Sequence, residues 1–309
     1  MTHLRLLGLT ILFTLAGCGG GGEKHYVPDP HPQPAPDPTT IVDVAVADGR
    51  FTTLVAALQA AGLDGTLDDE NAEFTVFAPT DDAFNLLGQD AIDSLLADTE
   101  TLTDILTYHV LSGEVDASQA ISLAGSAVEM VNGDSIGLSL DNEDLLINTS
   151  TVIIADVQAD NGIIHVIDAV LIPPAEKGEP SMDIVETAVA DGNFTTLVAT
   201  LQATGLDAAL SDDSVNYTVF APTDSAFAMI DPATIDILLA NTDVLSSILL
   251  QHVVDAEVNS VTAYSLNGAS AATLSGANIP VLINSETDTL TFGGATIIAK
   301  DIYTSNGII

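Results

Sequence analysis

The chain has 309 residues, 47% of them hydrophobic, and carries 44 Asp and Glu against 5 Lys and Arg, a formal net charge of −39. The apolar share excludes a disordered chain, and the length suits two domains of ordinary size. A negative field of this size argues against nucleic-acid binding and against anionic lipid headgroups. It also favours a saline habitat or one rich in divalent cations, where ions screen the repulsion.

Residues 1–17 are predicted to be a lipoprotein signal peptide. The apolar run from Leu6 to Leu15 is too short to span a bilayer as a mature helix. It leads into Leu-Ala-Gly-Cys18, which resembles the lipobox of bacterial lipoproteins, where the thiol of Cys18 takes the lipid. An ordinary cleaved signal would explain the small residues but not a lone Cys at this place.

Gly19 follows the cysteine, where an Asp would suggest retention at the inner membrane under the sorting rule of such lipoproteins. The expected location is therefore the cell envelope, at the outer membrane or the cell surface. The chain would meet the membrane only through its lipid anchor, because two or more acyl chains hold a protein stably.

Residues 18–39 form a glycine- and proline-rich tether that holds the folded part away from the lipid. His25 and His31 lie in this tether, but an unstructured pair lacks the fixed geometry of a metal site. We place the first domain at 40–174, a proline-bearing linker at 175–181 and the second domain at 182–309.

The two domains are tandem repeats. The segment from Asp48 to Asp64 returns almost unchanged from Asp191 to Asp207, a shift of 143 residues. Toward the end the shift becomes 145, as from Asp156 to Asp301. A period of this length is far above that of solenoid repeats and indicates separate domains.

Each repeat opens with capped amphipathic helices. Thr40 with Asp43, and Asp183 with Glu186, have the spacing of a capping box, and Gly62 is a helix stop. The next segment, Phe74–Phe84, predicts a strand that ends at a proline and turns directly into a helix capped by a threonine. A well-capped structural junction explains this segment without any chemistry.

Later in each repeat the apolar pattern changes from helical to strand-like. In the first repeat two further amphipathic helices lead into Tyr108 and His109, and strands follow at Val128–Val131, Ile136–Leu140, Leu145–Ile147 and Val152–Val157. A type I′ turn is expected at Asn161–Gly162, before a last strand over Gly162–Ile172. Helices first and strands later predict an α+β domain.

The second repeat stops at Ile309, inside its last hairpin. We therefore expect its closing strand to be missing, which would leave unpaired strand edges open to strand addition.

These segments resemble the fasciclin I type domain of insect fasciclin, vertebrate periostin and many bacterial surface lipoproteins. The match covers residue 40 to the end, and two signatures carry it in order. The resemblance implies a wedge of β-strands with a layer of helices, and adhesion or matrix binding as the general role. The signature residues are Phe77, Pro79, Thr80, Asp81 and Phe84, then Phe220, Pro222, Thr223, Asp224 and Phe227, and finally Asn161, Gly162, His165 and Asp168.

The family also carries a Tyr-His pair between its signatures, matched here by Tyr108 and His109. In animal relatives this region is linked to integrin binding, so Tyr108, His109 and the second repeat's His252 are candidate binding residues. Gln251 replaces the tyrosine in the second repeat, which weakens the match there. The alternative is that both histidines are buried and bonded to nearby backbone.

No catalytic or metal-binding motif stands out, so no enzymatic activity and no cofactor are expected. The acidic turns Asp141–Asp144 and Asp68–Glu70 could collect Ca²⁺ weakly, but neither has the ligand spacing of an EF-hand loop, and solvated turns also account for them.

Two functions follow. The first is a lipid-anchored surface adhesion protein that binds a protein, a glycan or a second copy of itself. The second is an envelope carrier or accessory protein for a small apolar ligand, which would need a deep apolar pocket.

Overall fold

The structure is a computed structural model that describes residues 39–309. The proposed signal peptide, Cys18 and the tether histidines His25 and His31 lie outside the described residues.

The first repeat begins with helices, as its sequence predicts. Its helices are α1 (Ile41–Asp48), α2 (Thr52–Ala61), α3 (Asp64–Leu67), α4 (Asp81–Leu87), α5 (Gln89–Ala97), α6 (Thr99–Tyr108) and α7 (Ala117–Ser122). Thr40 caps α1 and forms the expected capping box with Asp43. Helix α2 ends at Gly62, whose φ of 68° is the left-handed conformation that glycine adopts without strain.

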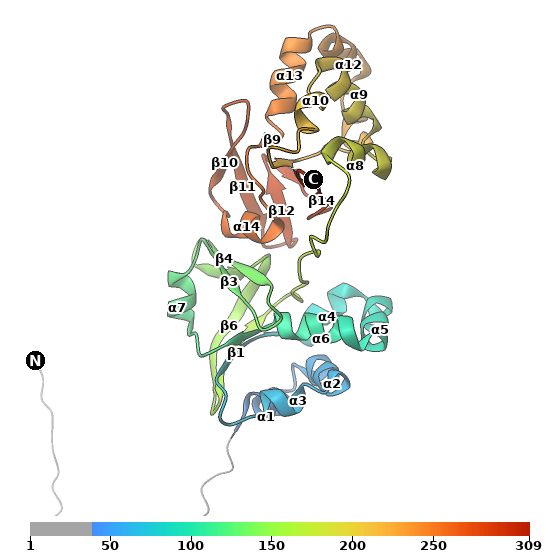
Figure 1. Cartoon of the computed structure of the whole chain (residues 1–309). Helices are drawn as coiled ribbons and strands as arrows, with labels where there is room; N and C mark the ends of the chain where they lie inside the picture. The colour runs from blue at the N-terminus through green and yellow to red at the C-terminus, as the bar shows by residue number, and fades with distance from the viewer. Residues whose placement is uncertain (1–38) are drawn as a thin grey trace, which may run out of the picture. The chain divides into compact units, whose positions relative to one another are not determined.

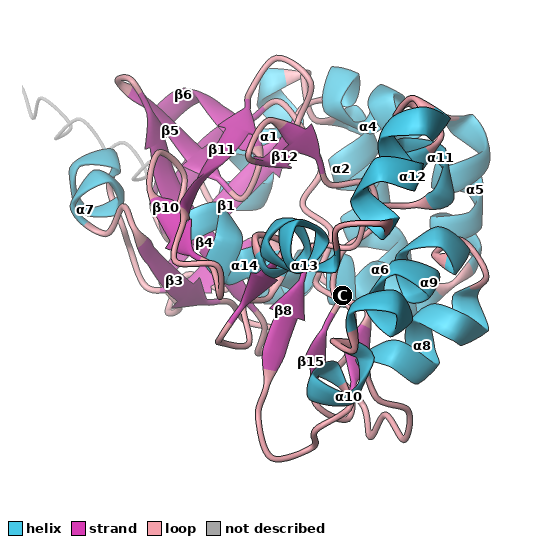
Figure 2. Cartoon of the chain, turned by 90° about the horizontal axis from the view of Figure 1, so that it is seen from above, coloured by secondary structure: helices cyan, strands magenta, loops and turns pink. Residues whose placement is uncertain are grey.

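Seven strands of this repeat form one sheet in the order β2-β1-β7-β6-β5-β4-β3. They are β1 (Phe74–Pro79), β2 (Val110–Ser112), β3 (Ser126–Glu129), β4 (Ser135–Asp141), β5 (Asp144–Ile147), β6 (Ser150–Ala159) and β7 (Gly162–Ile167). Strand β1 pairs parallel with β7 from Phe74–Gly162 to Pro79–Ile167. Figure 1 shows helices α2, α4, α5 and α6 beside the β1 end of this sheet, and Figure 2 distinguishes helices from strands by colour.

The core of the first repeat has two parts. One packs the helices against β1 and β7, through residues such as Phe51, Leu106 and Ile164. The other lies in the strand region and gathers Phe77, Tyr108 and residues of β4, β5 and β7. Tyr108 at the end of α6 therefore packs into the strand part of the core.

The turn before β7 differs from its prediction. Ala159 pairs with Gly162, so the loop residues are Asp160 and Asn161, and neither has the positive φ of a type I′ turn. Gly162 is instead the first residue of β7, with a φ of 146°, and a Cβ there would lie 1.9 Å from the backbone oxygen of Phe74. The glycine is needed for this close parallel approach. The strand also ends at Ile167, before the predicted Ile172.

The second repeat follows the same order of elements. Its helices are α8 (Ile184–Asp191), α9 (Thr195–Thr204), α10 (Asp207–Leu210), α11 (Asp224–Phe227), α12 (Pro232–Leu239), α13 (Thr242–Leu250) and α14 (Ser260–Ser265). Its strands are β8 (Tyr217–Val219), β9 (Val253–Val254), β10 (Ser270–Ala272), β11 (Asn278–Asn284), β12 (Thr289–Phe292), β13 (Ala295–Thr296), β14 (Tyr303–Thr304) and β15 (Gly307–Ile308). They form two sheets, β10-β11-β12-β13 and β14-β15-β8-β9. Mixed helices and sheets in both repeats confirm the α+β class.

Side chains of the two repeats also contact each other. Leu146 of β5 is fully buried in a cluster with Tyr264 of α14 and Val281 of β11. Gly137 in β4 lies so close to α14 that a Cβ would approach the backbone oxygen of Val261 to 2.6 Å. This glycine therefore permits the close packing of α14 on β4.

Candidate functional site

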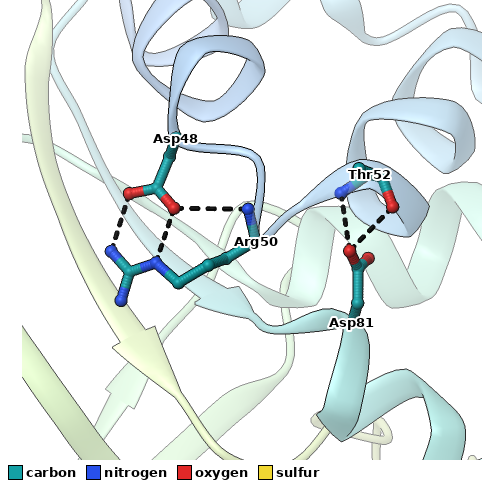
Figure 3. A network of polar contacts seen from close by, with 4 residues as sticks. All are labelled: Asp48, Arg50, Thr52 and Asp81. Carbon is teal, nitrogen blue, oxygen red and sulfur yellow. Dashed lines mark hydrogen bonds and ion pairs between the residues drawn. The ribbon is translucent and has the colours of Figure 1, made fainter.

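The strand-to-helix junction is a polar joint between three elements. Thr80 caps α4 by accepting a hydrogen bond from the backbone N–H of Ala83. Asp81 reaches to the start of α2, where one carboxylate oxygen accepts from the Thr53 N–H at 2.7 Å and the other from the Thr52 hydroxyl at 2.7 Å. Figure 3 shows Asp81 beside Thr52. One acidic side chain thus holds the starts of two helices together.

The second repeat builds the same joint. Thr223 caps α11, and Asp224 accepts from the Thr195 hydroxyl and the Thr196 N–H, each at 2.7 Å. Hydrogen bonds from Thr195 and Thr196 lower the pKa of Asp224 to about 2. At Asp81, burial raises the carboxyl pKa, but the bonds from Thr53 and Thr52 outweigh it and leave that pKa below the ordinary value.

An ion pair near the first joint distinguishes it from the second. The Arg50 guanidinium contacts both carboxylate oxygens of Asp48, at 2.5 and 2.6 Å, as Figure 3 shows. The hydrogen bond from Arg50 lowers the pKa of Asp48. In the second repeat Asn193 bonds to Asp191 in its place. The pair lies on the surface, where such contacts contribute little to stability.

The other signature residues are also used inside the fold. Asn161 accepts from the Ile41 N–H at 2.8 Å and donates to the Leu67 backbone oxygen at 2.8 Å. Asn306 makes the matching bonds to Ile184 and Leu210. These amides connect the loop before the last strand to two helices, which explains why the same residues recur in both repeats.

His165 and Asp168 stabilise the strands around β7. The His165 ring is fully buried, contacts the Val115 backbone oxygen at 2.9 Å and stacks on Phe77. Asp168 accepts from the Ser150 hydroxyl and the Thr151 N–H, at 2.9 and 2.7 Å.

The remaining signature residues lie where the strand turns into the helix. Pro79 ends β1 and Phe84 is buried in α4. In the second repeat Phe220 stacks on Phe292, while Phe227 packs against the helical core. Pro222 lies in the loop between β8 and α11.

The candidate binding pair of the first repeat is buried. Only 2% of His109 is exposed; its Nδ1 donates to the Ile105 backbone oxygen at 2.7 Å, and its Nε2 accepts from the Leu171 N–H at 2.9 Å. Both ring nitrogens are thereby satisfied in the neutral form. Burial lowers the pKa of His109 to about 4.

Tyr108 is fully buried as well. Its hydroxyl donates to the Ser135 backbone oxygen at 2.7 Å and accepts from the Asn148 side chain at 3.0 Å. Burial raises the pKa of this hydroxyl far above its ordinary value. Asn148 lies 40 residues from Tyr108, so sequence spacing gave no signal for it. Contact with a partner would require this part of the core to open, and the binding role of Tyr108 and His109 stays a prediction.

The second repeat presents the matching residues differently. Gln251 is exposed and His252 is half-buried. The Nδ1 atom of His252 contacts the Ile248 backbone oxygen at 2.9 Å. Here a ring edge meets solvent, so His252 is the more accessible of the three candidate binding residues.

A polar groove runs along α6, the helix that ends at Tyr108. Its volume is about 800 Å³. Its walls are Thr99, Glu100, Thr101, Thr103, Asp104, Thr107, Asn132 and Glu176. We call this the α6 groove. Thr99, Thr103 and Thr107 recur about one helical turn apart, and this spacing is the sequence signal of the groove. A second hollow of about 420 Å³ is lined mainly by polar groups, including Asp134 and Lys177.

The acidic turns bond to their neighbours. Asp68 accepts from the Thr40 hydroxyl at 2.6 Å, and Asp141 accepts from the Ser285 hydroxyl at 3.0 Å. Between residues 39 and 309, no group of three or more His, Cys, Asp or Glu side chains is arranged to hold a metal ion.

The chain is similar to known proteins along both repeats. Protein sll1483 of Synechocystis is 44% identical over 137 residues, which cover 44% of this chain and 74% of that protein. Human periostin is 30% identical over 253 residues, which cover 79% of this chain and 27% of periostin. A solved FAS1 domain pair from the insect cell adhesion molecule fasciclin I matches with a TM-score of 0.38 and 20% identity, covering 85% of this chain and 95% of that one.

The fasciclin domain matches twice, over residues 49–173 and 192–309. These two stretches make up most of the chain and include both strand-to-helix joints. The chain therefore belongs to the fasciclin domain family.

Proposed function

We propose that this chain is a lipid-anchored adhesion protein of the cell envelope, attached through Cys18, that binds a surface or matrix protein or glycan through the outer faces of its two fasciclin domains. Family membership supports the adhesive role. The polar signature residues Asp81, Asn161 and His165 are bonded to other segments of their own repeat. Partners would therefore meet the exposed surface and not the signature residues.

The α6 groove carries this proposal. Its lining offers hydroxyls, carboxylates and one carboxamide beside the methyl groups of its threonines, a mixture that fits the hydroxyls and ring faces of a glycan or an extended peptide. Thr103 and Thr107 donate to backbone oxygens of α6 at 2.7 Å, which leaves the lone pairs of their hydroxyls free to accept. The groove would thus offer a ligand mainly hydrogen-bond acceptors.

The carrier alternative has less support. A carrier of a small apolar ligand needs a deep apolar pocket, whereas the residues that line the α6 groove are all polar or charged, with apolar as well as polar atoms facing it. Binding of an apolar fluorescent dye to the folded chain, displaced by fatty acids, would favour that alternative.

An aggregation assay tests the proposal. Beads coated with the lipid-free chain are mixed with each other and with glycan- or matrix-coated beads, with and without Ca²⁺ at high ionic strength. We expect clumping, and we expect Thr103→Arg to reduce it about tenfold because the arginine fills the groove. Ser246→Arg, at the matched position of the second repeat, is the control. Equal clumping by both variants would contradict the groove, and no clumping with any surface would contradict adhesion.

The anchor is tested separately. Cells that make the full chain should incorporate labelled fatty acid into it, and Cys18→Ser should release it from the envelope. Soluble chain in both cases would contradict the anchor without touching the adhesive role.

A further inference from the structure

Helices α12 and α13 of the second repeat expose large apolar side chains. Met229, just before α12, is 88% exposed; Ile237 on α12 is 62% exposed and Val244 on α13 is 53% exposed. We call these three residues the α12–α13 face. Single exposed apolar residues are ordinary, but several on one pair of helices mark a surface with a purpose.

The core does not require these side chains. On α13 the inward positions are Leu245 and Leu249, which are 3% and 4% exposed. Val244 precedes Leu245 by one residue and thus lies about 100° away around the helix, on the solvent side. A polar residue at Val244 or Ile237 would serve the fold equally well.

The first repeat shows that alternative at two of the three positions; its counterpart of Met229 is Leu86, which is itself 71% exposed. At a shift of 143 residues, Ser94 and Thr101 occupy the positions of Ile237 and Val244, and both are exposed. The second repeat has also lost carboxylates along the same pair of helices. Ala233, Asn241 and Ser247 stand where the first repeat has Asp90, Asp98 and Asp104. These losses of charge and gains of apolar side chains are confined to surface positions and leave the inward leucines in place.

A lipid surface fits this face poorly. No helix among residues 39–309 is by itself long and apolar enough to cross a membrane; α12 and α13 together have the length, but they meet at a bend of 106°. Helices that lie on a bilayer carry Lys and Arg beside their apolar side chains, whereas this segment exposes Asp231, Asp236 and Asp243. If a second copy of the chain docked on this face, the same carboxylates of the two copies would lie against each other and repel.

Charge complementarity selects another occupant. Lys300 is the one Lys or Arg between residues 182 and 309. We propose that the α12–α13 face docks a cationic amphipathic segment of a partner protein, with apolar side chains on Ile237 and Val244 and Lys or Arg beside Asp236 and Asp243. Apolar contact would supply affinity and the charges would supply orientation. The face lies in the other repeat from the α6 groove, so the two proposals fail independently.

The test uses the full chain and two peptides of equal positive charge, each of about five helical turns. One has leucines on one face and lysines on the other; the second has serines in place of the leucines and reports non-specific attraction to the acidic chain. Fluorescence anisotropy at about 0.15 M salt should show the leucine peptide binding at least about tenfold more tightly. The double variant Ile237→Ser, Val244→Thr, which copies the first repeat, should reduce that advantage to less than about twofold.

Two controls make the result specific. Ser94→Ile with Thr101→Val should create a second site in the first repeat. A peptide with glutamates in place of lysines should not bind. Equal binding of the leucine and serine peptides, or an advantage that survives the double variant, would overturn the proposal. The proposal would also be overturned if the chain shows no preference between the peptides but binds vesicles or dimerises, and the double variant abolishes that binding or dimerisation.

Discussion

The two repeats are alike at their joints and unlike at their Tyr-His positions. Asp81 and Asp224 make the same bonds at the same distances, whereas His109 is buried between two backbone partners and His252 is half-buried. Residues that recur at the joint therefore have the same structural role in both repeats. The histidine also recurs, but its surroundings differ between the repeats. The predictions below test this difference, from the largest expected effect to the smallest.

Replacing each histidine by leucine should give the largest difference in stability between the two repeats. His109→Leu leaves the Leu171 N–H and the Ile105 backbone oxygen buried without a partner, so the first repeat should lose about 3 kcal/mol of unfolding free energy. His252→Leu should cost the second repeat less than about 1 kcal/mol, because solvent reaches its ring. Hydrogen exchange of the amides in β1 and in β8 measures each repeat in the same sample. Equal losses would contradict the difference in burial.

Acid should act on the first repeat through the same histidine. The pKa of His109 is lowered to about 4 in the folded chain, so between pH 6.5 and 4 the unfolded chain binds a proton that the folded chain does not. Stability is complete above about pH 6.5 and falls as the pH drops; by pH 5 the first repeat should lose about 2 kcal/mol relative to pH 7.5. The carboxylates also titrate, so the measure is the difference between the wild type and His109→Leu. A difference that is constant with pH would contradict the lowered pKa.

Removing the tyrosine hydroxyl should have a smaller effect. Tyr108→Phe keeps the ring in the core but leaves the Ser135 oxygen and the Asn148 amide without their partner, at a cost of about 1.5 kcal/mol. Adding Asn148→Leu should recover none of this loss, because Asn148 also accepts from the Gly137 N–H at 2.8 Å and its φ of 55° disfavours leucine. If Tyr108 binds a partner directly, Tyr108→Phe should reduce bead aggregation even at low temperature, where the loss of stability leaves the first repeat folded.

The smallest contrast lies between the two joints. Asp224, with its pKa lowered to about 2, stabilises the second repeat above about pH 4, and that contribution is lost as the pH falls toward 2. Asp81 should behave in the same direction. Carboxyl titration by NMR should find both pKa values below the ordinary aspartate range, and Asp224→Asn should make the second repeat less sensitive to acid. A normal titration of either residue would contradict the shared joint.

Much of the fold could be predicted because its signals are local. The capping box at Thr40, the glycine stop at Gly62 and the alternation over Ile136–Leu140 each depend on neighbours within a few residues. The turn at Asn161 was misplaced by one residue because Gly162 serves the parallel contact with Phe74, which is distant in the sequence.

The candidate site was harder to predict for the same reason. The burial of Tyr108 depends on strands that follow it by 27 to 40 residues, through Ser135 and Asn148. The α6 groove needs Asn132 and Glu176 from other segments. By contrast, the change from Ser94 to Ile237 was visible by aligning the repeats, but only the structure shows that both positions face solvent.

The parallel pairing of β1 with β7 also governs how the first repeat folds. Phe74 cannot form its strand pair until Gly162, 88 residues later in the chain, is in place. Contacts this far apart close slowly, on the order of milliseconds to seconds, and until then β1 offers an open edge to any other unfinished chain. The net charge of −39 keeps such chains apart during that interval. The acidity that limits what the folded protein can bind therefore also protects it while it folds.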